Sequence, residues 1–172
     1  MSNKKLTLNF GINNEHDLFN KLKRDLDKLL NEASTDNHTK TIDNTYNFLI
    51  TAYHLSSDWT KDDKYKTKKE MIPKSFENLL IAVRFLANSS KHKELTSRLD
   101  ENTVENVTEP IVGNYWDYIY GNQVYITIDG KQESLSLLSV SLMQYFEWLL
   151  DDSKIANEIP DKVKNFRLME TE

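Results

Sequence analysis

The segment IDNTYNFLITAYHLSSDWT, residues 42–60, decides the fold. Drawn as a helix, it is apolar around much of its circumference, and its apolar side chains are Tyr46, Phe48, Leu49, Ile50, Ala52, Tyr53, Leu55 and Trp59. A helix of this kind needs neighbours on several sides to cover it. We therefore predict a central helix from about Ile42 to Thr60, with Asp43 as a candidate cap at its start.

Three further segments supply the neighbours. Residues 14–33 form an amphipathic pattern that Asn13 or Asn14 can cap. Pro73 suits the first turn of a helix that we expect to end around residues 90–93, and residues 137–150 repeat the helical spacing of leucines and aromatics. The sequence thus predicts a mainly α fold, a bundle of about four helices.

A small β-hairpin is predicted beside the last helix, at about residues 123–135. Residues 123–128 alternate along a β-branched run, Asp129-Gly130 is a strong turn signal, and residues 131–135 form the return strand. Residues 94–122 show no lasting period, so we expect mostly irregular structure there, with one short helix near 95–100. We assign residues 1–152 to a single domain and residues 153–172 to a loosely attached tail, where Phe166 and Leu168 could dock.

Composition excludes several classes of protein. The 172 residues are 38% hydrophobic and contain no Cys, which rules out disulfide scaffolds, thiolate zinc sites, iron–sulfur clusters and Cys nucleophiles. No apolar run reaches the roughly 18 residues that cross a bilayer, and the start lacks the apolar core of a signal peptide. Gly-rich phosphate loops, Rossmann fingerprints and nucleophile elbows are also missing. We expect a cytoplasmic protein without membrane contact or cofactor.

The net charge of −5 conceals a basic middle segment. Residues 61–98 carry ten basic and five acidic side chains, whereas residues 99–172 carry five and fourteen. Such a segment can contact phosphates even in an acidic protein, because salt confines each field to roughly 8 Å. Lys66, Lys68, Lys69 and Lys91 are therefore candidate nucleic-acid contacts. The alternative is that this lysine-rich run merely solvates a loop.

Four polar residues stand out on the central helix. Asn47, Thr51, His54 and Asp58 follow one another at steps of four, three and four residues, which places them on one stripe. His54 and Asp58 can hydrogen bond across one turn, an arrangement that would orient the imidazole. The stripe is either a half-buried structural feature or one side of a polar site.

A matching set lies on the helix that begins near Pro73. Arg84, Asn88 and His92 climb it at steps of four residues. If the two helices pack antiparallel, His54, Asp58, Arg84, Asn88 and His92 form one group, in which two imidazoles supply acid–base catalysis and Arg84 or Lys91 stabilises developing charge. The alternative is a structural network in which Arg84 pairs with Asp58 and Asn88 ends the helix.

The sequence contains two weaker signals besides this group. His54, Asp58 and His92 could ligate a divalent metal, but the spacing typical of a zinc enzyme is missing, so we predict no metal site. The rings of Tyr115, Trp116, Tyr118, Tyr120 and Tyr125 could stack bases, anchor a protein interface or simply cover the β-ribbon.

The segment from Arg84 to His92 resembles the HEPN superfamily, in which an Arg precedes a spaced His near the end of a bundle helix. In that pattern a polar residue and then four to six residues separate the two. Here the apolar Phe85 follows Arg84, and seven residues in all lie between Arg84 and His92. The resemblance implies a small helical, usually dimeric domain, and often a metal-independent endoribonuclease of toxin or defence systems. Residues 52–59 and 84–92, with the Asp129-Gly130 ribbon and the last helix, are also similar to a group of small uncharacterised bacterial proteins.

Two functional hypotheses follow. In the first, the chain is a bacterial HEPN-like ribonuclease or RNA-binding protein, with His54 and His92 as acid and base, Arg84 as charge stabiliser, and Asp58 and Asn88 as orienting groups. In the second, it is a non-catalytic helical interaction module, a homodimer whose polar stripe is structural. Both imply a homo-oligomer, and only the first implies RNA as a partner.

Overall fold

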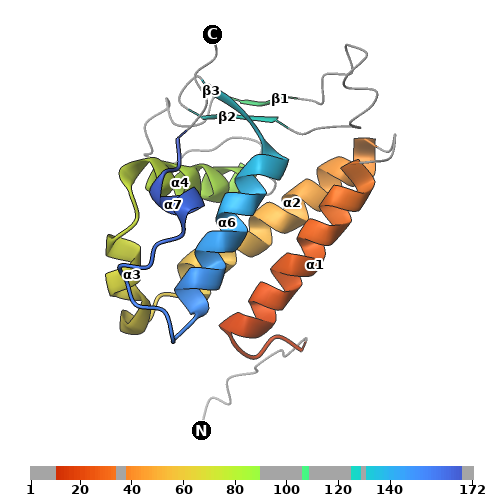
Figure 1. The fold of residues 1–172 in the computed structure, drawn as a ribbon. Helices are drawn as coiled ribbons and strands as arrows, with labels where there is room; N and C mark the ends of the chain where they lie inside the picture. Colours follow the sequence, from red (N-terminus) through yellow and green to blue (C-terminus); the bar gives the residue numbers. More distant parts are fainter. Residues whose placement is uncertain (1–10, 34–37, 90–105, 109–124, 129–130, 168–172) are drawn as a thin grey trace, which may run out of the picture.

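A computed structural model describes residues 11–33, 38–89, 106–108, 125–128 and 131–167 of the chain. The predicted mainly α fold is confirmed: four long helices, α1 (Glu15–Ala33), α2 (His38–His54), α4 (Lys74–Ser89) and α6 (Leu135–Leu150), form the bundle. Helix α1 packs on both α2 and α6, and α2 also packs on α4. Helices α1, α2 and α6 run alongside one another, and α4 crosses behind α6 (Figure 1). No described helix is long and apolar enough to cross a bilayer.

The start of α1 is fixed by reciprocal side-chain bonds. The Asn14 side chain accepts a hydrogen bond from the Asp17 backbone N–H at 2.9 Å, and the Asp17 carboxylate accepts one from the Asn13 N–H at 2.9 Å. Each bond satisfies a backbone donor that the helix itself leaves unpaired. Of the two predicted caps, Asn14 is therefore the residue that caps the helix.

Helix α2 begins and ends differently from the prediction. It starts at His38, so the candidate cap Asp43 lies inside the helix. After His54 the chain continues as a π-helical turn, η1 (Leu55–Trp59). The Ser56 and Ser57 hydroxyls both donate to the Tyr53 carbonyl at 2.9 Å, and such bonds compete with the regular backbone ladder. The bonds of these two serines thus account for the change from α-helical to π-helical winding after His54.

The predicted lysine-rich loop contains two short helices, η2 (Asp63–Tyr65) and α3 (Lys66–Glu70). Lys64 and Tyr65 of this segment bind the Glu15 carboxylate at the start of α1, at 2.7 and 2.6 Å. Lys68 is buried and reaches the end of α6. The segment therefore joins the start of α1 to the end of α6. The alternative of a solvated lysine run is wrong for Lys68, whereas Lys61, Lys66 and Lys74 are exposed.

The hairpin lies where the sequence predicted it. Strands β2 (Tyr125–Ile128) and β3 (Lys131–Ser134) pair antiparallel, with Tyr125 opposite Ser134 and Ile128 opposite Lys131. A third strand, β1 (Asn106–Thr108), pairs with the other edge of β2. Strand β1 was not predicted, because a strand of three residues is too short to display a period. The predicted helix near residues 95–100 lies outside the described residues.

The segment after α6 packs more closely than the sequence indicated. It carries the short helix α7 (Asp161–Lys164), and Val163 and Phe166 belong to the hydrophobic core, at 0% and 8% exposure. The Phe166 ring meets Phe76 of α4 edge-on at 5.5 Å, and the Phe166 carbonyl accepts a hydrogen bond from Ser75 at 2.8 Å. The expected docking of Phe166 is thus present, whereas Leu168 lies outside the described residues.

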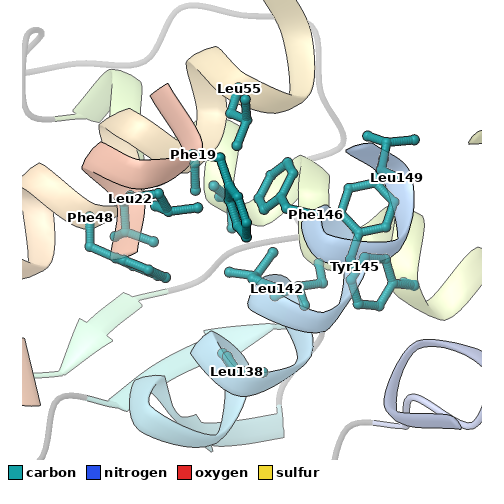
Figure 2. Close-up of a cluster of buried hydrophobic side chains, with 14 of the residues drawn as sticks. Phe19, Leu22, Phe48, Leu55, Leu138, Leu142, Tyr145, Phe146 and Leu149 are labelled. Atoms are coloured by element: carbon teal, nitrogen blue, oxygen red, sulfur yellow. The ribbon is translucent and has the colours of Figure 1, made fainter. Parts of the chain in front are cut away.

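Helix α6 is the centre of the core. Leu138, Leu142, Tyr145, Phe146 and Leu149 are all buried (Figure 2). The Phe146 ring packs on Phe19 of α1, whereas the Tyr145 ring packs on Phe76 of α4. Full burial of a large apolar side chain contributes about 1.5–3 kcal/mol, so this helix supplies much of the stability. The central position predicted for residues 42–60 is therefore shared by α2 and α6.

Candidate functional site

The polar stripe of α2 divides between two environments. Thr51 is buried, and its hydroxyl donates either to the Asp25 carboxylate of α1 at 2.7 Å or to the Asn47 carbonyl at 2.8 Å. The Lys21 ammonium donates to the same Thr51 hydroxyl at 2.6 Å. Lys21 also pairs with Asp25. Asn47 itself is exposed. This half of the stripe is a structural link between α1 and α2.

His54 and Asp58 form the predicted pair. The His54 Nδ1 lies 2.7 Å from the Asp58 Oδ2, and the two side chains are 37% and 62% exposed. The imidazole also packs against the neighbouring Tyr53 ring, with centroids 5.3 Å apart. The carboxylate on Nδ1 leaves Nε2 as the nitrogen that can exchange a proton with a ligand. The pair is accessible and oriented, as acid–base chemistry requires.

Only part of the predicted group on α4 lies within the described residues. Arg84 is exposed and Asn88 is half-buried, while Lys91 and His92 lie outside the described residues. Within the described part of the chain no ion pair joins Arg84 to Asp58, so the alternative in which these two residues pair is not present. Asn88 does not end α4, which continues to Ser89.

Arg84 instead borders a pocket of about 370 Å³ between η1, α3, α4 and α6. The pocket is lined by Tyr53, Ser56, Ser57, Lys69, Ile72, Glu77, Leu80, Ile81, Arg84 and Tyr145. Its walls are mostly aliphatic and aromatic, with a few charged groups at the border, a composition typical of small-molecule sites. His54 does not line it, although Tyr53 and Ser56 on either side of that residue do.

Two polar groups of this pocket have unusual surroundings. Lys69 is half-buried and donates to the Ser56 carbonyl at 2.7 Å, and burial lowers the pKa of its ammonium. Tyr145 is fully buried, and its hydroxyl has no hydrogen-bond partner among the described residues. Burial raises the pKa of this phenol above its usual range, so the hydroxyl stays neutral and can donate a hydrogen bond.

The candidate phosphate contacts differ in their availability. Lys66 is exposed. Lys68 is buried, and its ammonium donates to the carbonyls of Trp148 and Asp151 at 2.8 Å each. The prediction for Lys68 is corrected on this ground, since a buried ammonium engaged with two carbonyls is not free to meet a phosphate. Lys69 reaches the pocket and keeps two further donors.

Sequence reasoning missed the pocket itself. Tyr145 reads as a core residue and Lys69 as one of a run of lysines, so neither signals a site. The π-helical turn η1 would have been a signal, because such turns often occur at functional sites. The sequence contains the Ser56-Ser57 pair of this turn, but the pair alone does not predict π-helical winding.

In the described residues no group of three His, Asp or Glu side chains is close enough to hold a metal ion. Comparison of the chain with protein-family models, curated proteins and solved structures found no match.

Proposed function

We propose that this protein binds RNA and cleaves it without a metal ion. One observation carries the proposal: Arg84 and Lys69 border a pocket that is also lined by Ser56 and Ser57, which lie in sequence between His54 and Asp58. Two cations and an oriented imidazole are the groups that a phosphodiester needs for charge stabilisation and proton transfer. His92, three residues after Ser89 in the sequence, is the second acid–base group in this proposal.

The proposed reaction is an internal transesterification. One imidazole removes the proton of the ribose 2′-hydroxyl, and the oxygen attacks the adjacent phosphorus. The bond from phosphorus to the 5′-oxygen breaks, and the second imidazole, as imidazolium, gives that oxygen a proton. The products are a 2′,3′-cyclic phosphate and a 5′-hydroxyl. Arg84 stabilises the extra negative charge on the phosphoryl oxygens, and Asp58 orients His54.

The test is cleavage of a mixed RNA pool in the presence of EDTA. Wild type is compared with Arg84→Ala/His92→Ala and with His54→Ala, and Arg24→Ala serves as the control because Arg24 is an exposed arginine on α1. We expect at least a hundredfold loss in the double variant, since one general acid or base contributes about 10²–10⁴-fold, and no loss in the control. Melting curves confirm that each variant is folded. Equal cleavage by all four proteins would overturn the proposal.

The second candidate function is a non-catalytic, homodimeric interaction module. It is favoured by Leu137 and Val140, which lie one turn apart on α6 and are 50% and 44% exposed. If wild type is dimeric by light scattering and Leu137→Ser/Val140→Ser is monomeric, while no RNA is bound or cleaved, this candidate replaces the first.

A further inference from the structure

We infer that the pocket between η1, α3, α4 and α6 holds one unstacked base of a single-stranded RNA. The inference rests on the proposed function and names the part of the RNA that this site recognises. Sequence-specific recognition of RNA mostly uses bases that have left the stack, because their edges and faces are then accessible.

The size and walls of the pocket fit a base and its sugar. A volume of about 370 Å³ is at the lower end of the range for small ligands, roughly 300–1,000 Å³. Leu80 and Ile81 of α4 and Ile72 supply aliphatic walls, and Tyr53 supplies a ring. Contact of a flat base with such a surface is favourable whichever of the four bases it is.

The polar groups favour a heterocycle over a fatty acid or a simple anion. Lys69 and Arg84 can only donate hydrogen bonds, whereas the Glu77 carboxylate can only accept them. A fatty acid or an inorganic phosphate that occupied the apolar part of the pocket would use the donors alone and leave the Glu77 carboxylate without a role in binding. A base carries both N–H groups and acceptor atoms, so it can use both kinds of partner.

The hydroxyl of Tyr145 adds an independent argument. It is fully buried without a partner among the described residues, and it belongs to a side chain that lines this pocket. Leaving such a group unsatisfied is costly, and native structures seldom do so without a reason. Because the hydroxyl has no accessible surface in the empty pocket, a base reaches it only when a neighbouring side chain of the lining moves, and the hydrogen bond then removes that cost.

The first experiment measures binding of the four nucleoside 5′-monophosphates by saturation-transfer NMR and calorimetry. Ribose 5-phosphate is the control compound, because it has the phosphate and the sugar but no base. Stacking of one base contributes about 1–3 kcal/mol, so at least one nucleotide should bind about tenfold more tightly than ribose 5-phosphate. Equal binding of all five compounds, or no binding by any of them, would overturn the inference.

Two variants then locate the site. Tyr145→Phe should weaken binding of that nucleotide about tenfold, and Ile81→Trp should abolish it by filling the pocket. Ile155→Trp is the matched control, since Ile155 is 61% exposed and does not line the pocket. If both pocket variants are folded and bind as wild type does, the base does not enter here.

The outcomes separate this inference from the proposed function. Cleavage of RNA without nucleotide binding in the pocket would retain the ribonuclease and remove the base subsite. Nucleotide binding that Tyr145→Phe weakens, without RNA cleavage by wild type, would retain the subsite and remove the ribonuclease.

Discussion

Tyr145 combines a packing role with an unsatisfied polar group. Its ring centroid lies 5.1 Å from that of Phe76 and 5.0 Å from that of Phe146, so it joins the core side chains of α4 and α6. Its hydroxyl lacks a partner among the described residues. The leucine and aromatic spacing of α6 predicts the ring position, but not the isolation of the hydroxyl, which depends on side chains far away in the sequence.

Removing this hydroxyl should stabilise the free protein. A buried polar group without a partner costs about 1–3 kcal/mol, so we expect Tyr145→Phe to raise the free energy of unfolding by about 1 kcal/mol in urea titrations. Tyr65→Phe is the matched control, because the buried Tyr65 donates its hydroxyl to Glu15 at 2.6 Å. That variant should lose about 1 kcal/mol. A loss of stability in Tyr145→Phe would mean that the hydroxyl is already satisfied.

At the scale of elements, α3 joins two helix ends through neighbouring lysines. Lys68 donates to carbonyls at the end of α6, and Lys69 donates to the Ser56 carbonyl in η1. The last carbonyls of a helix have no partner within it and carry partial negative charge, so an ammonium there is favourable. This contact also offsets the negative charge of Asp151 and Asp152, which is unfavourable at the C-terminal end of a helix.

The Lys68 contacts should be among the strongest of a single side chain in this fold. Lys68→Met keeps the apolar stem but removes the ammonium, leaving the Trp148 and Asp151 carbonyls without this donor. We expect a loss of about 2–3 kcal/mol in urea titrations, because hydrogen bonds from charged donors contribute about 1.5–3 kcal/mol. Lys66→Met, on the same short helix but exposed, should change stability by less than about 0.5 kcal/mol. Equal effects of the two substitutions would contradict the capping role of Lys68.

The link between α1 and η2 should make stability sensitive to acid. Hydrogen bonds from Lys64 and then Tyr65 lower the pKa of Glu15 from 4.5 to about 2. A carboxyl whose pKa is lower in the folded state stabilises the fold above its unfolded pKa and loses that contribution as pH falls. Wild type should therefore lose stability between pH 4.5 and pH 2. Because Lys64 is half exposed, we expect this group to account for only about 1 kcal/mol.

Glu15→Gln provides the measurement for this link. The variant should be less stable than wild type at pH 6, and the difference should shrink by pH 2.5 in urea titrations at both pH values. Asp27→Asn, which replaces an exposed acid of α1, is the control and should show no such change. A constant difference between Glu15→Gln and wild type across this range would exclude the pKa of Glu15 as its cause.

For the whole molecule, local sequence patterns predicted the helices and the hairpin. The features that were not predicted depend on contacts between residues far apart in the chain. Helical spacing located α1, α4 and α6, and the Asp-Gly turn located the hairpin, because these signals lie within a few residues of one another. The pairing of β1, the burial of Lys68 and the packing of the tail depend on residues far apart in the chain. The same holds for the site: the His54–Asp58 pair was predictable from one turn of helix, whereas the pocket beside it was not.

The tail connects this core to the pocket. Phe166 packs on Phe76, Phe76 packs on Tyr145, and Tyr145 forms part of the pocket lining (Figure 2 shows Tyr145 beside Phe146). Phe166→Ala should therefore lower the free energy of unfolding by about 3 kcal/mol, as expected for deletion of a buried ring. Nucleotide binding should weaken as well, since Phe76 loses its support. Ile155→Ala in the same tail is the control, because Ile155 is 61% exposed and should change neither quantity. If Phe166→Ala has the same free energy of unfolding and the same nucleotide affinity as wild type, the tail is not part of the core and does not stabilise the pocket.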